Sequence, residues 1–207
     1  SYASTISFQS NSLSGNKAFI LEIDSASNIN SFNNLAEPGS YMSAIDNATI
    51  LSGNKDFNFF ISKYDNNLDL LWSTASSGDG GSVGSAFINH VDSEGNQIMQ
   101  LDYSGCIGTA NINTSGKGTA LVKLNSDGQL VWYKNFIGKS IESIATLSDD
   151  EGNVYCHGIF SGDFDFGSTG FTNSTGKSLY FAKFDPDGNE IFFNEYKCTG
   201  NISKAGD

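Results

Sequence analysis

A strand, a tight turn and a second strand recur along this chain, and their spacing constrains the fold more than any other feature. The clearest copy spans 179–192, where Asp-Pro-Asp-Gly-Asn joins two aromatic-rich runs. Pro presets φ and Gly accepts a positive φ, so this stretch predicts a hairpin. Equivalent hairpins occupy 120–132 and 59–72, and a degenerate copy begins at Phe19. Such a period is typical of repeat architectures.

A lysine in the first strand of each hairpin and an aromatic residue in the second keep an interval of 60 residues. These positions are Lys63, Lys123 and Lys183, and Trp72, Trp132 and Phe192. A repeated position usually serves the repeat itself. We therefore expect lysine stems packed on the neighbouring repeat with paired head groups, and aromatic side chains that pack between repeats. The alternative is a ring of cations that lines a channel.

Two further strands precede the hairpin in each full copy. A Glu-Gly-Asn turn joins them, at 94–96 in one copy and at 151–153 in the next. Each full copy is thus expected to form four antiparallel strands in meander order, and radial repetition of such a unit makes a β-propeller. A solenoid or a sandwich is the competing arrangement. In the second copy we expect one strand over 41–51, so that this copy is shortened.

We predict an all-β chain with one propeller-type repeat domain over 1–207. The approximate repeats are 1–36 (partial), 37–76, 77–138 and 139–198, with the start of another at 199–207. At ~58 residues per repeat this gives about 3.5 blades, whereas a closed propeller has roughly 4–8. We therefore expect an open propeller whose exposed edge is met by further blades of a longer chain, by a second copy or by a partner subunit.

Residues 83–196 resemble the seven-bladed β-propeller repeat (SBBP) family of bacterial surface and secreted proteins. The motifs that match the family pattern are Gly-Asn-Val-Tyr at 152–155, Phe-Ser-Gly-Asp-Phe-Asp-Phe-Gly at 160–167 and Phe-Ala-Lys-Phe-Asp at 181–185. The match is partial over 41–82 and weak over 1–36, and Cys106-Ile107-Gly108 stands where Asp-Phe-Gly is expected. The resemblance implies a propeller, export to the cell surface and a binding or structural role, and it carries no catalytic residues.

The charge of the chain bears on its partners. Its 11 basic residues are all Lys and face 23 Asp and Glu, for a net charge of -12. Such a chain repels phosphate backbones and lacks the Arg fork that reads bases, so we expect no nucleic-acid partner. No apolar run is long enough for membrane insertion, and no segment has a signal-peptide pattern. Because the sequence begins at Ser1, we expect a processed protein or a piece of a longer one.

Acidic turns such as 185–189, 125–128 and 149–152 suggest calcium, which prefers oxygen ligands. No downstream Glu has the spacing of a calcium loop, and a type I turn has the same composition. We therefore predict plain turns, with no metal and no cofactor, and solvated carboxylates in Asp163-Phe164-Asp165.

The three cysteines, Cys106, Cys156 and Cys198, lack metal-site spacing and are expected as buried thiols. One disulfide is the alternative if the protein is secreted.

No catalytic constellation is evident. His90 and His157 are the only histidines, and no G-x-S-x-G elbow occurs. His157 follows Cys156 in a predicted strand, so their side chains should point to opposite faces. The stretch 170–178 lacks the spacing of a phosphate loop and is expected as a loop between blades. Paired carboxylates for glycoside cleavage remain open, because proximity is invisible in the sequence.

We therefore expect a non-enzymatic, exported β-propeller module, extracellular or at the cell surface, for adhesion, recognition or assembly through protein contacts. One alternative is a carbohydrate-binding accessory domain or a glycan-active enzyme, with the aromatic-rich segment 164–171 as its platform. The other is a structural subunit of a filament or envelope complex.

Overall fold

The computed structural model describes residues 5–8, 11–14, 19–34, 41–45, 47–55, 58–76, 82–105, 112, 114, 116–166 and 169–198. The expected break between repeats at 36–40, the motif departure at Cys106 and the start of another repeat at 199–207 lie outside this part of the chain. Within it all regular secondary structure is β-strand, which confirms the all-β prediction. None of these residues forms a helix that could cross a membrane.

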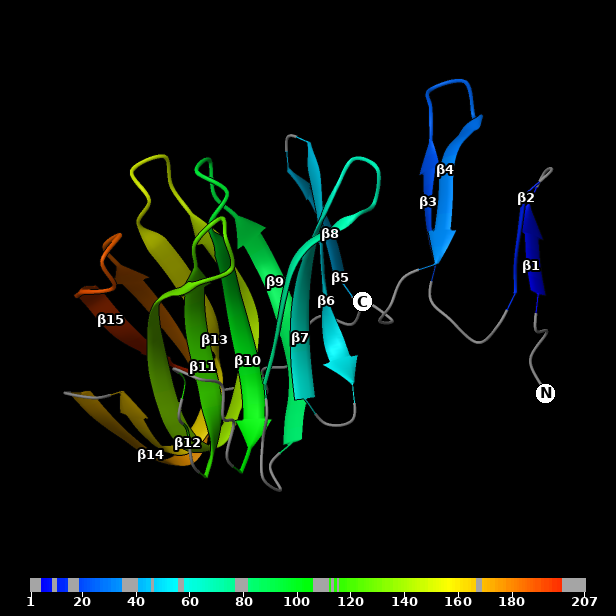
Figure 1. Ribbon diagram of the computed structural model, residues 1–207. Helices are drawn as coiled ribbons and strands as arrows, with labels where there is room; N and C mark the ends of the chain where they lie inside the picture. Colours follow the sequence, from blue (N-terminus) through cyan, green and yellow to red (C-terminus); the bar gives the residue numbers. More distant parts are fainter. Residues whose placement is uncertain are drawn as a thin grey trace.

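The described strands fall into four sheets that follow one another along the chain (Figure 1). Two are the hairpins β1–β2 and β3–β4, the third contains β5 to β8, and the fourth contains β9 to β15. The strands are β1 (Thr5–Phe8), β2 (Asn11–Ser14), β3 (Phe19–Ile23), β4 (Ile29–Asn34), β5 (Tyr41–Ile45), β6 (Ala48–Lys55), β7 (Asn58–Asp65), β8 (Leu70–Ala75), β9 (Ser82–Val91), β10 (Gln97–Ser104), β11 (Lys117–Leu124), β12 (Leu130–Ser148), β13 (Val154–Phe166), β14 (Thr169–Phe184) and β15 (Glu190–Lys197).

The seven-stranded sheet is a curled antiparallel meander in which β12 takes part twice. Its first half, from Leu130 to Ile137, pairs with β11, and its second half, from Ile137 to Ser148, pairs with β13. Register shifts in β12 next to Gly138 and Ser143 mark bulges, which bend a strand and increase its twist. The sheet therefore consists of two four-stranded units that share β12: the third unit, β9 to β12, and the last unit, β12 to β15.

The cross-strand register shows that the interval of 60 residues is also a spatial repeat. Each of the three repeated lysines lies between an apolar or aromatic residue on one neighbouring strand and an aromatic residue on the other. The sets are Ile50-Lys63-Trp72, Ile98-Lys123-Trp132 and Tyr155-Lys183-Phe192. Residues directly opposite one another share a face of the sheet, so each set defines the same face of its unit.

Hydrophobic clusters fill the space between successive layers. The first joins Ile20 of β3 to Leu51 and Tyr64 of the four-stranded sheet. The second joins the other face of that sheet to β10 and β11, and the third joins the third unit to β13 and β14. Buried members of these two clusters are Ile50, Phe59, Ile61, Met99, Leu101, Val122 and Leu124, and Ile98, Leu121, Trp132, Phe136, Phe164, Tyr180 and Phe184.

Two local predictions were wrong. The segment 41–51 forms a hairpin rather than one strand, because the register pairs Ile45 with Ala48 and leaves two residues for the turn. The second copy therefore has four strands and is not shortened. The stretch 170–178 belongs to β14 rather than to a loop, with Gly170 opposite Asp165 and Phe171 opposite Phe164.

Candidate interaction surface

Six turns in the described residues share one design. The side chain of the first residue, an Asp or Asn, accepts the backbone N–H of the fifth residue, and the fourth residue has a positive φ. The first residues are Asp24, Asp65, Asp92, Asn125, Asp149 and Asp185. Because the turn's own donors engage these oxygens, the acidic composition serves turn formation. No three His, Cys, Asp or Glu side chains of the described chain gather as metal ligands.

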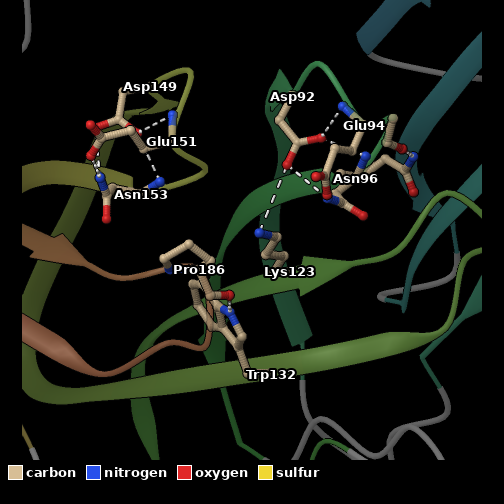
Figure 2. A network of polar contacts seen from close by, with 11 residues as sticks. Asp92, Glu94, Asn96, Lys123, Trp132, Asp149, Glu151, Asn153 and Pro186 are labelled. Carbon is tan, nitrogen blue, oxygen red and sulfur yellow. Dashed lines mark hydrogen bonds and ion pairs between the residues drawn. The ribbon is translucent and has the colours of Figure 1, made fainter.

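Each tryptophan contacts the turn of the following hairpin. Trp72 Nε1 donates to the Ser126 carbonyl at 3.0 Å, and Trp132 Nε1 donates to the Pro186 carbonyl at 2.9 Å. In both cases the acceptor belongs to the second residue of a turn, and Lys63 Nζ donates to the same Ser126 carbonyl at 3.1 Å. Figure 2 shows Trp132 lying beneath Pro186. The repeated aromatic position thus links one unit to the next, as predicted.

Gly128 and Gly188 make this close approach possible. A Cβ atom would lie 2.6 Å from the Trp72 ring at Gly128, and 2.8 Å from the Trp132 ring at Gly188. Both glycines also have a positive φ, of 78° and 82°. Glycine therefore serves both the turn and the fit of the ring.

The lysine head groups pair with the first residue of the preceding turn. Lys123 Nζ lies 3.8 Å from Asp92 Oδ2, and Lys183 Nζ lies 3.8 Å from Asp149 Oδ2. Figure 2 shows the two acidic turns, with Lys123 directed at Asp92. These contacts confirm the expectation of paired head groups.

The electrostatics of the second turn follow from its hydrogen bonds. The Asn153 side-chain amide, and then its backbone N–H, the Tyr155 hydroxyl and the Lys183 ammonium, hold the pKa of Asp149 to about 2. The pKa of Lys183 is raised, first by its contact with Tyr155, whose ring centroid lies 4.8 Å from Nζ. This corner therefore carries a charged pair at neutral pH.

A polar cluster that the sequence did not indicate links the third unit to the last. Asp102 Oδ1 accepts from Thr119 Oγ1 at 2.5 Å and from Ser143 Oγ at 2.7 Å. Thr119 is fully buried and Ser143 is 3% exposed. Partners 17 and 41 residues apart in sequence leave no local signal. The contacts satisfy polar groups between two layers.

The face of the last unit that bears Lys183 is open. Tyr155 and Phe181 stack with their centroids 6.2 Å apart, and Phe181 and Phe192 lie 5.5 Å apart. All four side chains are only partly buried. We call Tyr155, Phe181, Lys183 and Phe192 the terminal aromatic face. Leu147, opposite Tyr155, is 50% exposed and extends it.

The predicted separation of Cys156 from His157 is confirmed. Cys156 is a free, buried thiol whose pKa is raised by burial, whereas His157 is half-buried outside that cluster, with its pKa lowered by burial. His90 lies across from Ile98 on β10 and is also half-buried. Cys198 is free and half-buried, so it was wrongly expected to be buried.

The predicted sugar platform has little free aromatic surface. Phe164 is 1% exposed and stacks on Phe160 at 4.6 Å, and Phe171 is half-buried. An open pocket of about 540 Å³ nevertheless lies here, and the exposed Asp163 and Asp165 line it. Their exposure agrees with the prediction of solvated carboxylates.

No protein-family model and no curated protein matched the chain. The structure itself defines an all-β repeat protein whose antiparallel units pack layer on layer. The resemblance to the SBBP family stays a prediction.

Proposed function

We propose that this chain is a non-enzymatic, exported β-propeller module that mediates adhesion, recognition or assembly at the cell surface through protein contacts. The observation that carries the proposal is the terminal aromatic face. It groups three aromatic rings and a lysine, residue types that are common where proteins dock. Its counterparts on the preceding unit are already used to bind a neighbouring layer.

A propeller of about 3.5 four-stranded blades is part of this proposal. It is supported by the two four-stranded units that share β12, by the four-stranded sheet β5 to β8, and by the recurrent contact of a tryptophan with the next turn. Export and the surface location rest on the SBBP resemblance.

The proposal is tested with intact cells of the natural host. Protease added outside should digest the protein without lysis. Purified wild-type chain should also bind the cells saturably, and Phe181→Glu should weaken that binding about tenfold or more, because a charge in a docking face must be desolvated. Ile191→Glu is the matched control, since Ile191 is 51% exposed on the same strand as Phe192 but on its opposite face. Equal binding by all three chains would contradict the proposal.

A glycan-binding function is the second candidate, favoured by the pocket at Asp163 and Asp165. Pretreating the cells separates the two. Loss of binding after protease treatment supports a protein partner. Loss only after periodate oxidation, together with Asp163→Asn sensitivity, supports a glycan.

A further inference from the structure

The terminal aromatic face repeats a docking surface that the chain already uses internally. On the third unit the equivalent side chains are Ile98, Leu121 and Trp132, and they are at most 8% exposed because β13 and β14 pack over them. On the last unit no hydrophobic cluster of the described residues includes the corresponding side chains. The internal pattern therefore predicts a further layer of the same kind on this face.

The other end of the described stack presents a surface of the complementary kind. Ile20 of β3 is buried against the four-stranded sheet, so its neighbours along β3 point the other way. Leu21 is half-buried there and Ile23 is 50% exposed. We call Leu21 and Ile23 the β3 face. It belongs to the side of the repeat that, in the last unit, packs on Trp132.

The turn that follows β3 also matches. It begins at Asp24, and Asp24 accepts the N–H of Asn28 at 2.8 Å, as the first residues of the other turns do. Its second residue, Ser25, holds the position whose carbonyl receives Trp72 and Lys63 at Ser126.

We propose that the terminal aromatic face of one copy of this chain docks head to tail on the β3 face of a second copy. Phe181 packs on Ile23 of the second copy, and Lys183 Nζ donates to its Ser25 carbonyl as Lys63 donates to Ser126. The proposal rests on the proposed function and names its partner. Phe192 fills the tryptophan position without an N–H donor, so this contact is weaker than those inside the chain.

Two properties of the association follow. A head-to-tail contact uses different surfaces on the two copies, so it builds open chains or rings rather than stopping at a dimer. The net charge of -12 makes copies repel one another, and salt screens that repulsion. Association should therefore strengthen as the salt concentration rises.

Sedimentation velocity with two charge variants tests the geometry. The average mass of the wild type should rise with concentration, whereas Phe181→Glu alone and Ile23→Glu alone should each stay monomeric. An equimolar mixture should form a 1:1 dimer and nothing larger, because it contains one intact pair of faces. Ile191→Glu should associate as the wild type does. Phe192→Trp, which adds a donor for the Ser25 carbonyl, should tighten association about fivefold.

Several results would overturn the proposal. They are a wild type that is monomeric at every concentration, a mixture that stays monomeric, and an Ile23→Glu variant that still dimerises, which would mean that two aromatic faces meet each other. Circular dichroism checks folding, and Phe181→Ser with Ile23→Ser replaces any glutamate variant that unfolds. Cell binding by Ile23→Glu keeps the two proposals apart: it persists if the face binds other proteins even when self-docking fails.

Discussion

Lys123 and Lys183 occupy the same position in neighbouring units, yet their surroundings differ. The Lys123 side chain is 6% exposed and that of Lys183 is 20% exposed, although both lie 3.8 Å from the Asp of the preceding turn. The difference comes from the layer above them. The last unit covers the third, and nothing among the described hydrophobic clusters covers the last. One sequence pattern thus produces a core where a neighbour follows and a surface where none does.

The largest effect should separate Leu121 from Phe181, which are equivalent by the interval of 60 residues. Leu121 is fully buried, so Leu121→Ala should lower the free energy of unfolding by about 2–5 kcal/mol through lost burial and a cavity. Phe181→Ala should lower it by about 1 kcal/mol, since mainly its ring contacts are lost. Urea denaturation of dilute protein measures both. Equal losses would show that the two faces are covered alike.

The next effect concerns the glycine that faces Trp132. Gly188→Ala should cost about 2–3 kcal/mol, because the added Cβ meets the ring at 2.8 Å and the residue has a φ of 82°. Gly152 is the matched control. Its φ is 79°, but the nearest atom to an added Cβ is in Pro186 at 3.4 Å. Gly152→Ala should therefore cost about 1 kcal/mol from the backbone alone. A larger loss at Gly152 would contradict the close fit of the ring.

A smaller effect comes from exchanging the aromatic residues of the two units. Trp132→Phe removes the hydrogen bond to Pro186 and should cost about 1 kcal/mol in thermal or urea unfolding. Phe192→Trp should leave the stability of the monomer unchanged, because no turn of the same chain lies in the corresponding place among the described residues. A stabilised monomeric Phe192→Trp would reveal an acceptor within the chain and break the comparison.

The sequence predicted what local chemistry determines. Alternating apolar residues and Asp/Asn-to-Gly turns indicate strands and hairpins wherever they occur, and the repeated lysines and tryptophans revealed a spatial period. The hairpin within 41–51 was missed because its turn contains no glycine or proline. The strand in 170–178 was missed because glycine, serine and asparagine are typical of loops.

Long-range placement was beyond the sequence. The link between Asp102 and Ser143 depends on how two units stack, and each residue alone resembles any polar position of a strand. The exposure of Tyr155 and Phe181 likewise depends on which layers are present, and their aromatic character alone suggested a core.

The smallest expected effect is the acid response of the turn beside the terminal aromatic face. The pKa of Asp149 is held to about 2, below its ordinary value of 3.8, mainly by the Asn153 amide. A carboxyl group whose pKa is lower in the folded state stabilises the fold fully above the unfolded value, and loses this contribution as pH falls through the folded value. The loss should therefore occur between about pH 4 and about pH 2. It should be gradual, because the group is exposed to solvent and is one of several such turns.

Carboxyl-detected NMR measures the titration directly, and Asp149→Asn identifies the resonance while keeping a turn of the kind that Asn125 forms. Urea denaturation across the same pH range should give a shallower decline for Asp149→Asn than for the wild type. A titration midpoint near 3.8 would mean that Asn153, Tyr155 and Lys183 do not hold the carboxylate in solution. The charged corner of the terminal aromatic face would then be lost, and with it the reason to expect Lys183 at a fixed position in a docking surface.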